Sequence, residues 1–317
     1  MRELRARLSD SRWLGSAVVA AMVAGSLLFT YITLSNSTRS LLNLPQQPQL
    51  GFLLLALALV GVNHVLQSLV WHLYARNLHG ERDALKDVFR YSITALTRNL
   101  PGAFYWSTAS RALLYQKDGR TSFAAVATGV ELALQTISGG AVVLWLLAWP
   151  WGLLPALGLL VMPLLPGVVC FWQRLARHRI VATRWPALGA AFMDLARLSR
   201  RSLAMALVSY TIMWLIGGLF LEALVLAVGA SLPMRQTLYG IWVATSLVGI
   251  AGAVLLGGLG LVREFSLAGL LAPLVTLPVA TVLAALSRIV LVLGSWLWGA
   301  LTAAICHFAS RGRREHE

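Results

Sequence analysis

Residues 51–74 decide the fold, and they read GFLLLALALVGVNHVLQSLVWHLY. The stretch contains no Asp, Glu, Lys or Arg. As an α-helix it is about 36 Å long at a rise of 1.5 Å per residue, which exceeds the ~30 Å hydrocarbon core of a bilayer. The sequence therefore predicts a transmembrane helix over these residues.

Apolar runs of similar length recur along the whole chain of 317 residues. Hydrophobic residues make up 58% of the chain and charged residues only 12%, and the mean hydropathy is +0.74. A soluble protein of this size carries about twice that charged fraction. We therefore expect an all-α, polytopic membrane protein with about seven or eight transmembrane helices in a single integral membrane domain, residues 1–317. The expected spans are residues 13–34, 51–74, 121–149, 153–172 and 203–228, then helices near 237–256, 266–285 and 289–308.

Positive charge dominates the polar segments between these runs. The chain carries 26 Lys and Arg against 12 Asp and Glu, which gives a net charge of +14. Because cytoplasmic loops of membrane proteins are rich in Lys and Arg, we expect a cytoplasmic N-terminus at 1–12, a basic cytoplasmic loop at 173–201 and a basic tail at 309–317. The expected location is the cell (inner) membrane. Nucleic acid is not an expected partner, since no soluble basic domain is present to bind it.

A second informative stretch, residues 98–111, reads RNLPGAFYWSTASR. A helix expected from residue 84 ends before Pro101, because proline restricts the residue that precedes it, and a short helix resumes at 105–115. Neither half is long enough to span, so residues 84–115 are predicted to form a re-entrant hairpin broken at Pro101 and Gly102. Broken backbone is tolerated at membrane depth only where protein or a water-filled cavity covers it. The stretch therefore predicts a ligand-binding cavity, and the expected ligand is an anionic lipid headgroup.

Arg111 is the central residue of this predicted site. It follows the break, and Ser107 lies one helical turn before it. A guanidinium holds a phosphate in bidentate fashion, which a lysine cannot do; the alternative is an arginine that snorkels to the interface. The residues predicted to contact the headgroup are Arg98, Trp106, Ser107, Ser110 and Arg111.

A second break is expected within the C-terminal helices, residues 236–308. Residues 257–264 read GGLGLVRE, and the predicted helix-breaking residues are Gly257, Gly258 and Gly260. Arg263 and Glu264 follow, either as an ion pair that neutralises the break or as functional charges. If this segment is also re-entrant, the helix count falls and the tail lies outside, but the positive-inside rule favours a tail inside.

The two predicted breaks have the same order of features along the sequence. Small helix-breaking residues come first, then a short gap, a charged residue and a short apolar helix. The chain is therefore a candidate for an inverted repeat. Paired interrupted segments in two halves of a membrane protein are the best sequence indication of a transporter-type binding site.

Polar residues also recur on single faces of two predicted spans. Thr128, Glu131, Gln135 and Ser138 lie at helical spacing, and they form either a hydrogen-bonded helix–helix seam or a cavity wall in which Glu131 partners a proton or a cation. The residues predicted to balance charge or to couple transport are Glu131, Gln135, Arg263 and Glu264.

Residues 51–74 carry His64, Ser68 and His72 at i, i+4 and i+8. A two-histidine metal site needs a further ligand, and no acid lies on that face, so packed or pore-facing side chains are favoured over a metal. The chain has no Walker A, HExxH, GxSxG or GxGxxG motif. We therefore expect no metal, no cofactor and no enzyme activity.

At the two breaks the sequence resembles the transmembrane, flippase-like domain of the lysylphosphatidylglycerol synthase family. The likeness rests on residues 99–102 (NLPG) with 110–114 (SRALL), and on 257–264 (GGLGLVRE) with 287–288 (SR). It covers most of residues 50–308, although only these two blocks are specific. The resemblance implies a membrane protein that binds a lipid or translocates it between leaflets.

The chain also departs from the pattern of that family. Tyr105 and Trp106 stand where many relatives carry a glycine and an acid, and the second block lacks the proline that often precedes its glycines. The headgroup preference of the family is therefore not carried over. The soluble lysyl-transferring domain that follows the membrane part of full-length synthases is absent from this sequence, so the chain is not expected to aminoacylate lipids by itself.

The leading hypothesis is a flippase-like protein that binds or translocates an anionic (phospho)lipid, passively or coupled to a gradient. One alternative is an intramembrane enzyme or accessory subunit acting on isoprenoid or glycolipid phosphates, which requires a cluster of acids with a metal. Another is a membrane scaffold that recruits a soluble partner through residues 173–201. Besides a membrane phospholipid, the expected partners are a second copy of the chain or a separate lipid-modifying enzyme.

Overall fold

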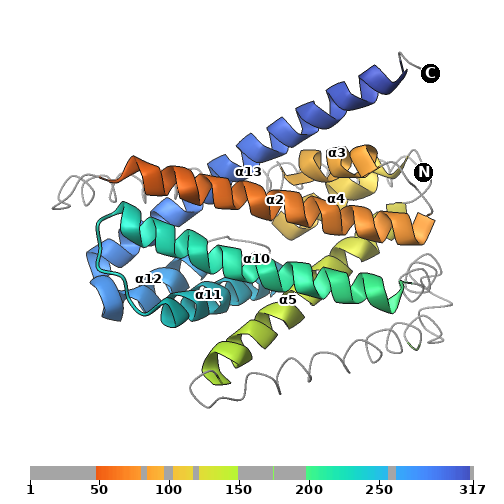
Figure 1. Ribbon diagram of the computed structural model, residues 1–317. Helices are drawn as coiled ribbons and strands as arrows, with labels where there is room; N and C mark the ends of the chain where they lie inside the picture. Colours follow the sequence, from red (N-terminus) through yellow and green to blue (C-terminus); the bar gives the residue numbers. More distant parts are fainter. Residues whose placement is uncertain are drawn as a thin grey trace, which may run out of the picture.

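The computed structural model describes residues 48–79, 84–95, 103–116, 121–148, 174, 198–255 and 262–314. These residues form eight α-helices and no strands (Figure 1), which confirms the expected all-α fold. Several expected features lie outside the described residues: the N-terminal segment 1–12, the spans 13–34 and 153–172, most of the loop 173–201, both breaks, and Arg98.

Four of the described helices are long and apolar enough to cross a membrane. They are α2 (Leu50–His79), α5 (Thr121–Ala148), α10 (Arg200–Ala227) and α13 (Leu277–Arg314). The first three agree closely with predicted spans. Large apolar side chains on these helices stay exposed, among them Leu69, Val208 and Leu297, and extended apolar surface of this kind suits contact with lipid. The chain is a helical membrane protein.

Two short helices follow α2. α3 (Ala84–Ala95) and α4 (Ala103–Leu114) have 12 residues each, so each is about 18 Å long and too short to cross a ~30 Å hydrocarbon core. They pack against each other; α3 also packs against α2 and α13, whereas α4 packs against α5. The two limbs predicted on either side of Pro101 are therefore present as helices.

The C-terminal third departs from the prediction. Its helices are α11 (Arg235–Leu255), α12 (Val262–Val275) and α13, which begins at Leu277 and continues without a break to Arg314. The chain turns at Thr276, whose φ of 84° is left-handed, and Pro278 fits the first turn of α13 because no helical N–H is needed there. Arg288, which was expected between two helices, lies inside α13. That part of the prediction was wrong.

The helix α2 packs against α10 and against the distant α13 (Figure 1). Toward its C-terminal end, the hydroxyl groups of Tyr74 and Tyr210 lie 3.2 Å apart. Gly61 leaves room for the indole of Trp298 on α13, since a Cβ at Gly61 would lie 2.4 Å from that ring. The indole N–H also donates to the carbonyl of Leu57 at 2.9 Å. A small residue and one hydrogen bond therefore join helices that are far apart in the sequence.

Buried apolar side chains form two clusters. One joins α2, α3, α5 and the first half of α10, and it includes Trp71; the other joins α2, α5 and the second half of α10 to α11, α12 and α13, and it includes Trp242. Each of these two tryptophans has the guanidinium of an arginine over its ring, Arg111 over Trp71 and Arg263 over Trp242. The fold thus places one group of charged residues against each apolar core.

Candidate functional site

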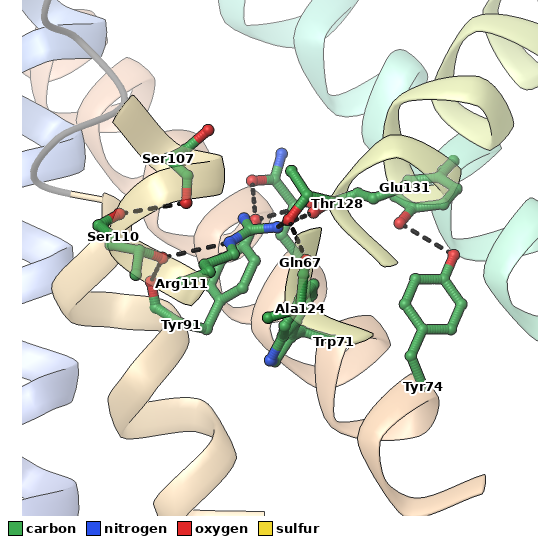
Figure 2. Close-up of polar contacts among 12 residues, drawn as sticks. Gln67, Trp71, Tyr74, Tyr91, Ser107, Ser110, Arg111, Ala124, Thr128 and Glu131 are labelled. Carbon is green, nitrogen blue, oxygen red and sulfur yellow. Dashed lines mark hydrogen bonds and ion pairs between the residues drawn. The ribbon is translucent and has the colours of Figure 1, made fainter. Parts of the chain in front are cut away.

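Arg111 on α4 is the centre of a buried polar cluster (Figure 2). Its side chain is only 5% exposed, and its Nη1 forms an ion pair with Oε2 of Glu131 on α5. Nη1 also donates to the hydroxyl of Thr128 at 3.2 Å, and Nε donates to the hydroxyl of Thr94 on α3 at 3.3 Å. Arg111 therefore ties both short helices to the long helix α5.

Two aromatic rings enclose the guanidinium of Arg111. Its Cζ lies 4.4 Å from the ring centroid of Trp71 on α2 and 4.6 Å from that of Tyr91 on α3. A cation held against aromatic faces in a desolvated site is stabilised more strongly than one in water. The hydroxyl of Tyr91 faces Oε1 of Glu131 at 3.1 Å and the carbonyl oxygen of Gln67 at 2.9 Å. Oε2 of Glu131 thus has Arg111 as its donor, and Oε1 shares the single hydroxyl proton of Tyr91 with the side-chain oxygen of Gln67.

The two threonines are oriented by their own helices. The Thr94 hydroxyl donates to the carbonyl of Tyr91 at 2.7 Å, and the Thr128 hydroxyl donates to the carbonyl of Ala124 at 2.8 Å. Their protons are therefore engaged, and their lone pairs face Arg111. We call this set the Arg111 cluster, and its members are Gln67, Trp71, Tyr91, Thr94, Arg111, Thr128 and Glu131.

A second acid, Asp87 near the start of α3, is completely buried beside this cluster. Its Oδ2 lies 3.0 Å from Nδ1 of His72, and its Oδ1 accepts a hydrogen bond from Tyr115 at 2.9 Å. The Tyr115 hydroxyl in turn accepts from the indole of Trp71 at 3.0 Å. Asp87 and Glu131 are therefore linked through Trp71, whose ring also faces Arg111.

Two histidines of α2, His64 and His72, face α3. His64 lies 3.1 Å from the hydroxyl of Ser92, and His72 contacts Asp87. The sequence of α2 has no acid on the face that carries these histidines, and the acid that contacts His72 is Asp87 on the neighbouring helix α3. In the part of the chain that the structure describes, no group of three or more His, Cys, Asp or Glu side chains is placed to hold a metal ion.

The other residues predicted to contact a headgroup are placed as follows. Ser107 is buried on α4, and the hydroxyl of Ser110 donates to the carbonyl of Ser107 at 3.1 Å. Trp106 lies within α4, but its side chain is outside the described residues, as are Arg98, Pro101 and Gly102. The structure thus brings Arg111 together with Glu131, while the hydroxyl of Ser110 is engaged within its own helix.

The polar face of α5 divides between two neighbours. Thr128 and Glu131 face Arg111, whereas the indole of Trp214 on α10 donates to the carbonyl of Gln135 at 3.1 Å and to the hydroxyl of Ser138 at 3.0 Å. The hydrogen-bonded seam predicted for this face is present at Gln135 and Ser138, and a cavity wall at Glu131 stays a prediction. One half is a hydrogen-bonded seam, and the other half holds the buried charge.

A second charged cluster lies where α12 meets α13. Arg263 and Glu264 stand in the first turn of α12, and Oε1 of Glu264 lies 3.3 Å from Nη1 of Arg288 on α13 and 3.7 Å from Nη1 of Arg263. The Cζ of Arg263 lies 4.5 Å from the ring centroid of Trp242 on α11. We call these four residues the Arg263 cluster. The glycines predicted to precede it, Gly257, Gly258 and Gly260, lie outside the described residues.

Sequence reasoning missed the contribution of α3. Asp87, Tyr91 and Thr94 follow one another at i, i+4 and i+7, which places them on one helical face. All three are buried, and all three contact the charged clusters or their neighbours. That spacing is a sequence signal for a polar face on α3, in addition to the place of α3 as one limb of the predicted hairpin.

The fold and these clusters define an integral membrane protein in which short helices carry buried charges against long, apolar ones. The profile of the family described as the lysylphosphatidylglycerol synthase TM region matches residues 12–299. The chain belongs to this family, as the two sequence blocks predicted. No curated protein and no solved structure matches the chain.

Proposed function

We propose that this protein binds an anionic phospholipid headgroup at Arg111 and moves the lipid between the two leaflets of the membrane. The observation that supports this most directly is the buried Arg111–Glu131 ion pair. It joins a helix too short to span a bilayer to one long enough to do so. Ionisable side chains inside a membrane domain are expensive to bury and mark paths of substrates or ions. The family description, which names a lipid synthase, supports a lipid as the ligand.

The proposal includes an orientation in the cell (inner) membrane with a cytoplasmic N-terminus. α2 and α10 are antiparallel, since Gln49 bonds to Ala227 at one end while Tyr74 meets Tyr210 toward the other. The exposed arginines Arg76 and Arg201 lie beyond this tyrosine pair. Because positive residues favour the cytoplasmic side, that end is assigned to the cytoplasm. α3 and α4 then form a re-entrant hairpin that enters from the same side.

A headgroup that binds Arg111 has to replace the carboxylate of Glu131. A phosphodiester and a carboxylate each carry one negative charge and present two oxygens to a guanidinium, so the exchange keeps Arg111 paired. Glu131 then takes a proton or a cation, because a second negative charge beside the phosphate is unfavourable. The hydroxyl of Tyr91 lies 3.1 Å from Oε1 of Glu131 and is near enough to stabilise either protonation state of that acid. Glu131 is therefore the proposed coupling residue.

The test is leaflet exchange in proteoliposomes that contain a fluorescent phosphatidylglycerol, with dithionite added outside to bleach the accessible leaflet. Wild-type protein should allow both leaflets to be bleached. The double variant Arg111→Gln/Glu131→Gln removes both charges together, and neutral replacement of a whole buried pair is commonly tolerated. This variant should fold, yet bleaching should stop at the outer leaflet.

The matched control is Arg201→Gln, which removes an exposed arginine at the start of α10 and should leave exchange unchanged. Exchange by the folded double variant at the wild-type rate would show that Arg111 has a purely structural role. If the wild type exchanges no labelled phospholipid between leaflets, the proposal that this protein translocates lipid is ruled out. The leading prediction that the protein is not an enzyme stays a prediction, and so do its alternatives, an enzyme or a scaffold. Association with a second copy or with a lipid-modifying enzyme is also still a prediction.

A further inference from the structure

Asp87 lies where three helices meet, and its two carboxylate oxygens face different partners. It stands in the first turn of α3 and is completely buried. The dipole of a helix favours a negative charge at this position. Oδ1 faces the hydroxyl of Tyr115, which follows α4, at 2.9 Å, and Oδ2 faces Nδ1 of His72 on α2 at 3.0 Å. One carboxylate therefore joins both short helices to the long helix α2.

The hydrogen bonds around Tyr115 define the direction of this arrangement. An indole N–H can only donate, and that of Trp71 donates to the hydroxyl oxygen of Tyr115 at 3.0 Å. The hydroxyl proton of Tyr115 is then directed at Oδ1 of Asp87. An ionised carboxylate only accepts, so the contact at Oδ2 needs a proton on Nδ1 of His72. Neutral imidazole and imidazolium can both carry that proton, so titration at Nε2 changes the charge of His72 and keeps the hydrogen bond.

His72 is the member of this pair that water can reach. Its side chain is 16% exposed, whereas that of Asp87 is 0% exposed. Histidine is the residue type that ordinarily changes its charge between about pH 5 and pH 8. A charged His72 attracts the carboxylate more strongly than a neutral one, because Coulomb attraction across 3.0 Å is added to the hydrogen bond. The contact between α2 and α3 is therefore strongest at acid pH and weakens as the pH rises through the titration of His72.

Other charged or titratable side chains lie on the helices that carry this pair or pack against it. They are His64 and Arg76 on α2, Lys86 and Arg90 on α3, Arg111 on α4, Tyr210 on α10 and His307 on α13. Lysine, arginine and tyrosine ordinarily keep their protonation state in this pH range. Of the two histidines, His64 contacts the hydroxyl of Ser92, and the ring of His307 lies 6.4 Å from that of Phe89. His72 differs from both in that its contact is an acid.

We propose that His72 and Asp87 form a proton-controlled fastening of α3 and α4 to α2, which is tight when His72 is charged and looser when it is neutral. The same helix α3 carries Tyr91 and Thr94 of the Arg111 cluster. A looser α3 therefore also loosens the surroundings of Arg111. The fastening adds control by pH to the site described above, and it acts on the helices rather than on a ligand.

The fastening can be measured without lipid, so this proposal and the proposed function can fail separately. Only the side from which protons reach His72 rests on the proposed function. Arg76 lies one helical turn after His72 and is exposed, at the end of α2 that was assigned to the cytoplasm. The controlling pH is therefore that of the cytoplasm.

The test is hydrogen–deuterium exchange of the amides of α3 in purified full-length protein, in a neutral detergent at about pH 5.5 and about pH 8.5. Dividing each rate by the intrinsic exchange rate at that pH gives the extent of local opening. In the wild type, corrected exchange in α3 should be about fivefold faster at the higher pH, while amides in the middle of α10 should change little. His72→Asn keeps a neutral donor near the position of Nδ1 but does not titrate, so the pH difference should disappear.

The matched control is His64→Gln, which removes the other histidine of α2 that faces α3 and keeps a polar group beside Ser92. This control should retain the full pH difference. If His72→Asn does not fold, Asp87→Asn keeps an oxygen for the hydroxyl of Tyr115 and should also abolish the difference. Equal exchange of the wild type at both pH values would overturn the proposal. A wild-type pH difference in folded His72→Asn or Asp87→Asn would overturn it too, as would loss of the difference in His64→Gln.

Discussion

Each of the two predicted breaks is followed by a short helix that carries one member of an ion pair, and the charges are exchanged between the two cases. After the first break, α4 carries the cation Arg111, and its anion Glu131 lies on the next helix, α5. After the second break, α12 carries the anion Glu264, and the cation Arg288 lies on the next helix, α13. In both cases an ion pair joins a short helix to a long one, buried in the first case and partly buried in the second. Each short helix also carries an arginine that lies over a tryptophan of another helix.

The two clusters differ in how completely their polar atoms are satisfied. Glu131 has a partner on each oxygen, and Arg111 has two threonine acceptors and two aromatic faces. Glu264 has both of its cations on one oxygen. Both carboxylate oxygens of Glu131 are therefore within hydrogen-bond distance of a donor, whereas Oε2 of Glu264 has no hydrogen-bond partner among the described residues.

The largest expected effect is that of Glu131→Gln, which leaves Arg111 buried without its anion. Breaking a buried pair from one side costs about 3–5 kcal/mol of unfolding free energy. Denaturant unfolding in detergent micelles measures this loss. Addition of Arg111→Gln should recover most of it, and failure to recover would mean that the pair is not the main energetic feature of the cluster.

A smaller loss is expected for Glu264→Gln. Its ion-pair distances are 3.3 and 3.7 Å and its two cations are partly exposed, so the change should remove about 1.5–3 kcal/mol. The same unfolding assay applies. If Glu264→Gln lowers the unfolding free energy as much as Glu131→Gln does, the two clusters do not differ in how much their acids contribute to stability.

The smallest effect is expected for Tyr91→Phe, which keeps the ring on Arg111 but removes the hydroxyl beside Glu131. One carboxylate oxygen then loses its donor, so the first cluster comes to resemble the second. We expect a loss of about 1 kcal/mol in unfolding free energy. A higher unfolding free energy for Tyr91→Phe would show that the hydroxyl of Tyr91 destabilises the folded protein rather than stabilising it.

Much of the fold was predictable from composition and from a single proline. The spans α2, α5 and α10 follow from uninterrupted apolar runs, and Pro101 separates the two limbs now seen as α3 and α4. The start of α13 was not predicted, because the expected helices at 266–285 and 289–308 place Arg288 between them rather than inside one helix. Inside a membrane domain a charge is tolerated in a helix when its partner is present, and that partner, Glu264, lies in another helix.

The candidate site was predictable only in outline. Arg111 and Glu131 stood out as charges among apolar residues, yet their direct contact depends on how α4 packs against α5. Asp87 was not singled out, because its partners His72 and Tyr115 come from other segments. Periodicity shows which face of a helix a residue occupies, but it does not show which helix covers that face.

The indole of Trp298 seated over Gly61 also constrains the order of assembly. The hydrogen bond from Trp298 to Leu57 spans 241 residues of sequence. At a synthesis rate of roughly 5–20 residues per second, α2 emerges from the ribosome on the order of ten to fifty seconds before its partner exists. Throughout that interval the indole that covers Gly61 in the folded protein is missing, so α2 and α13 can pack together only late in synthesis.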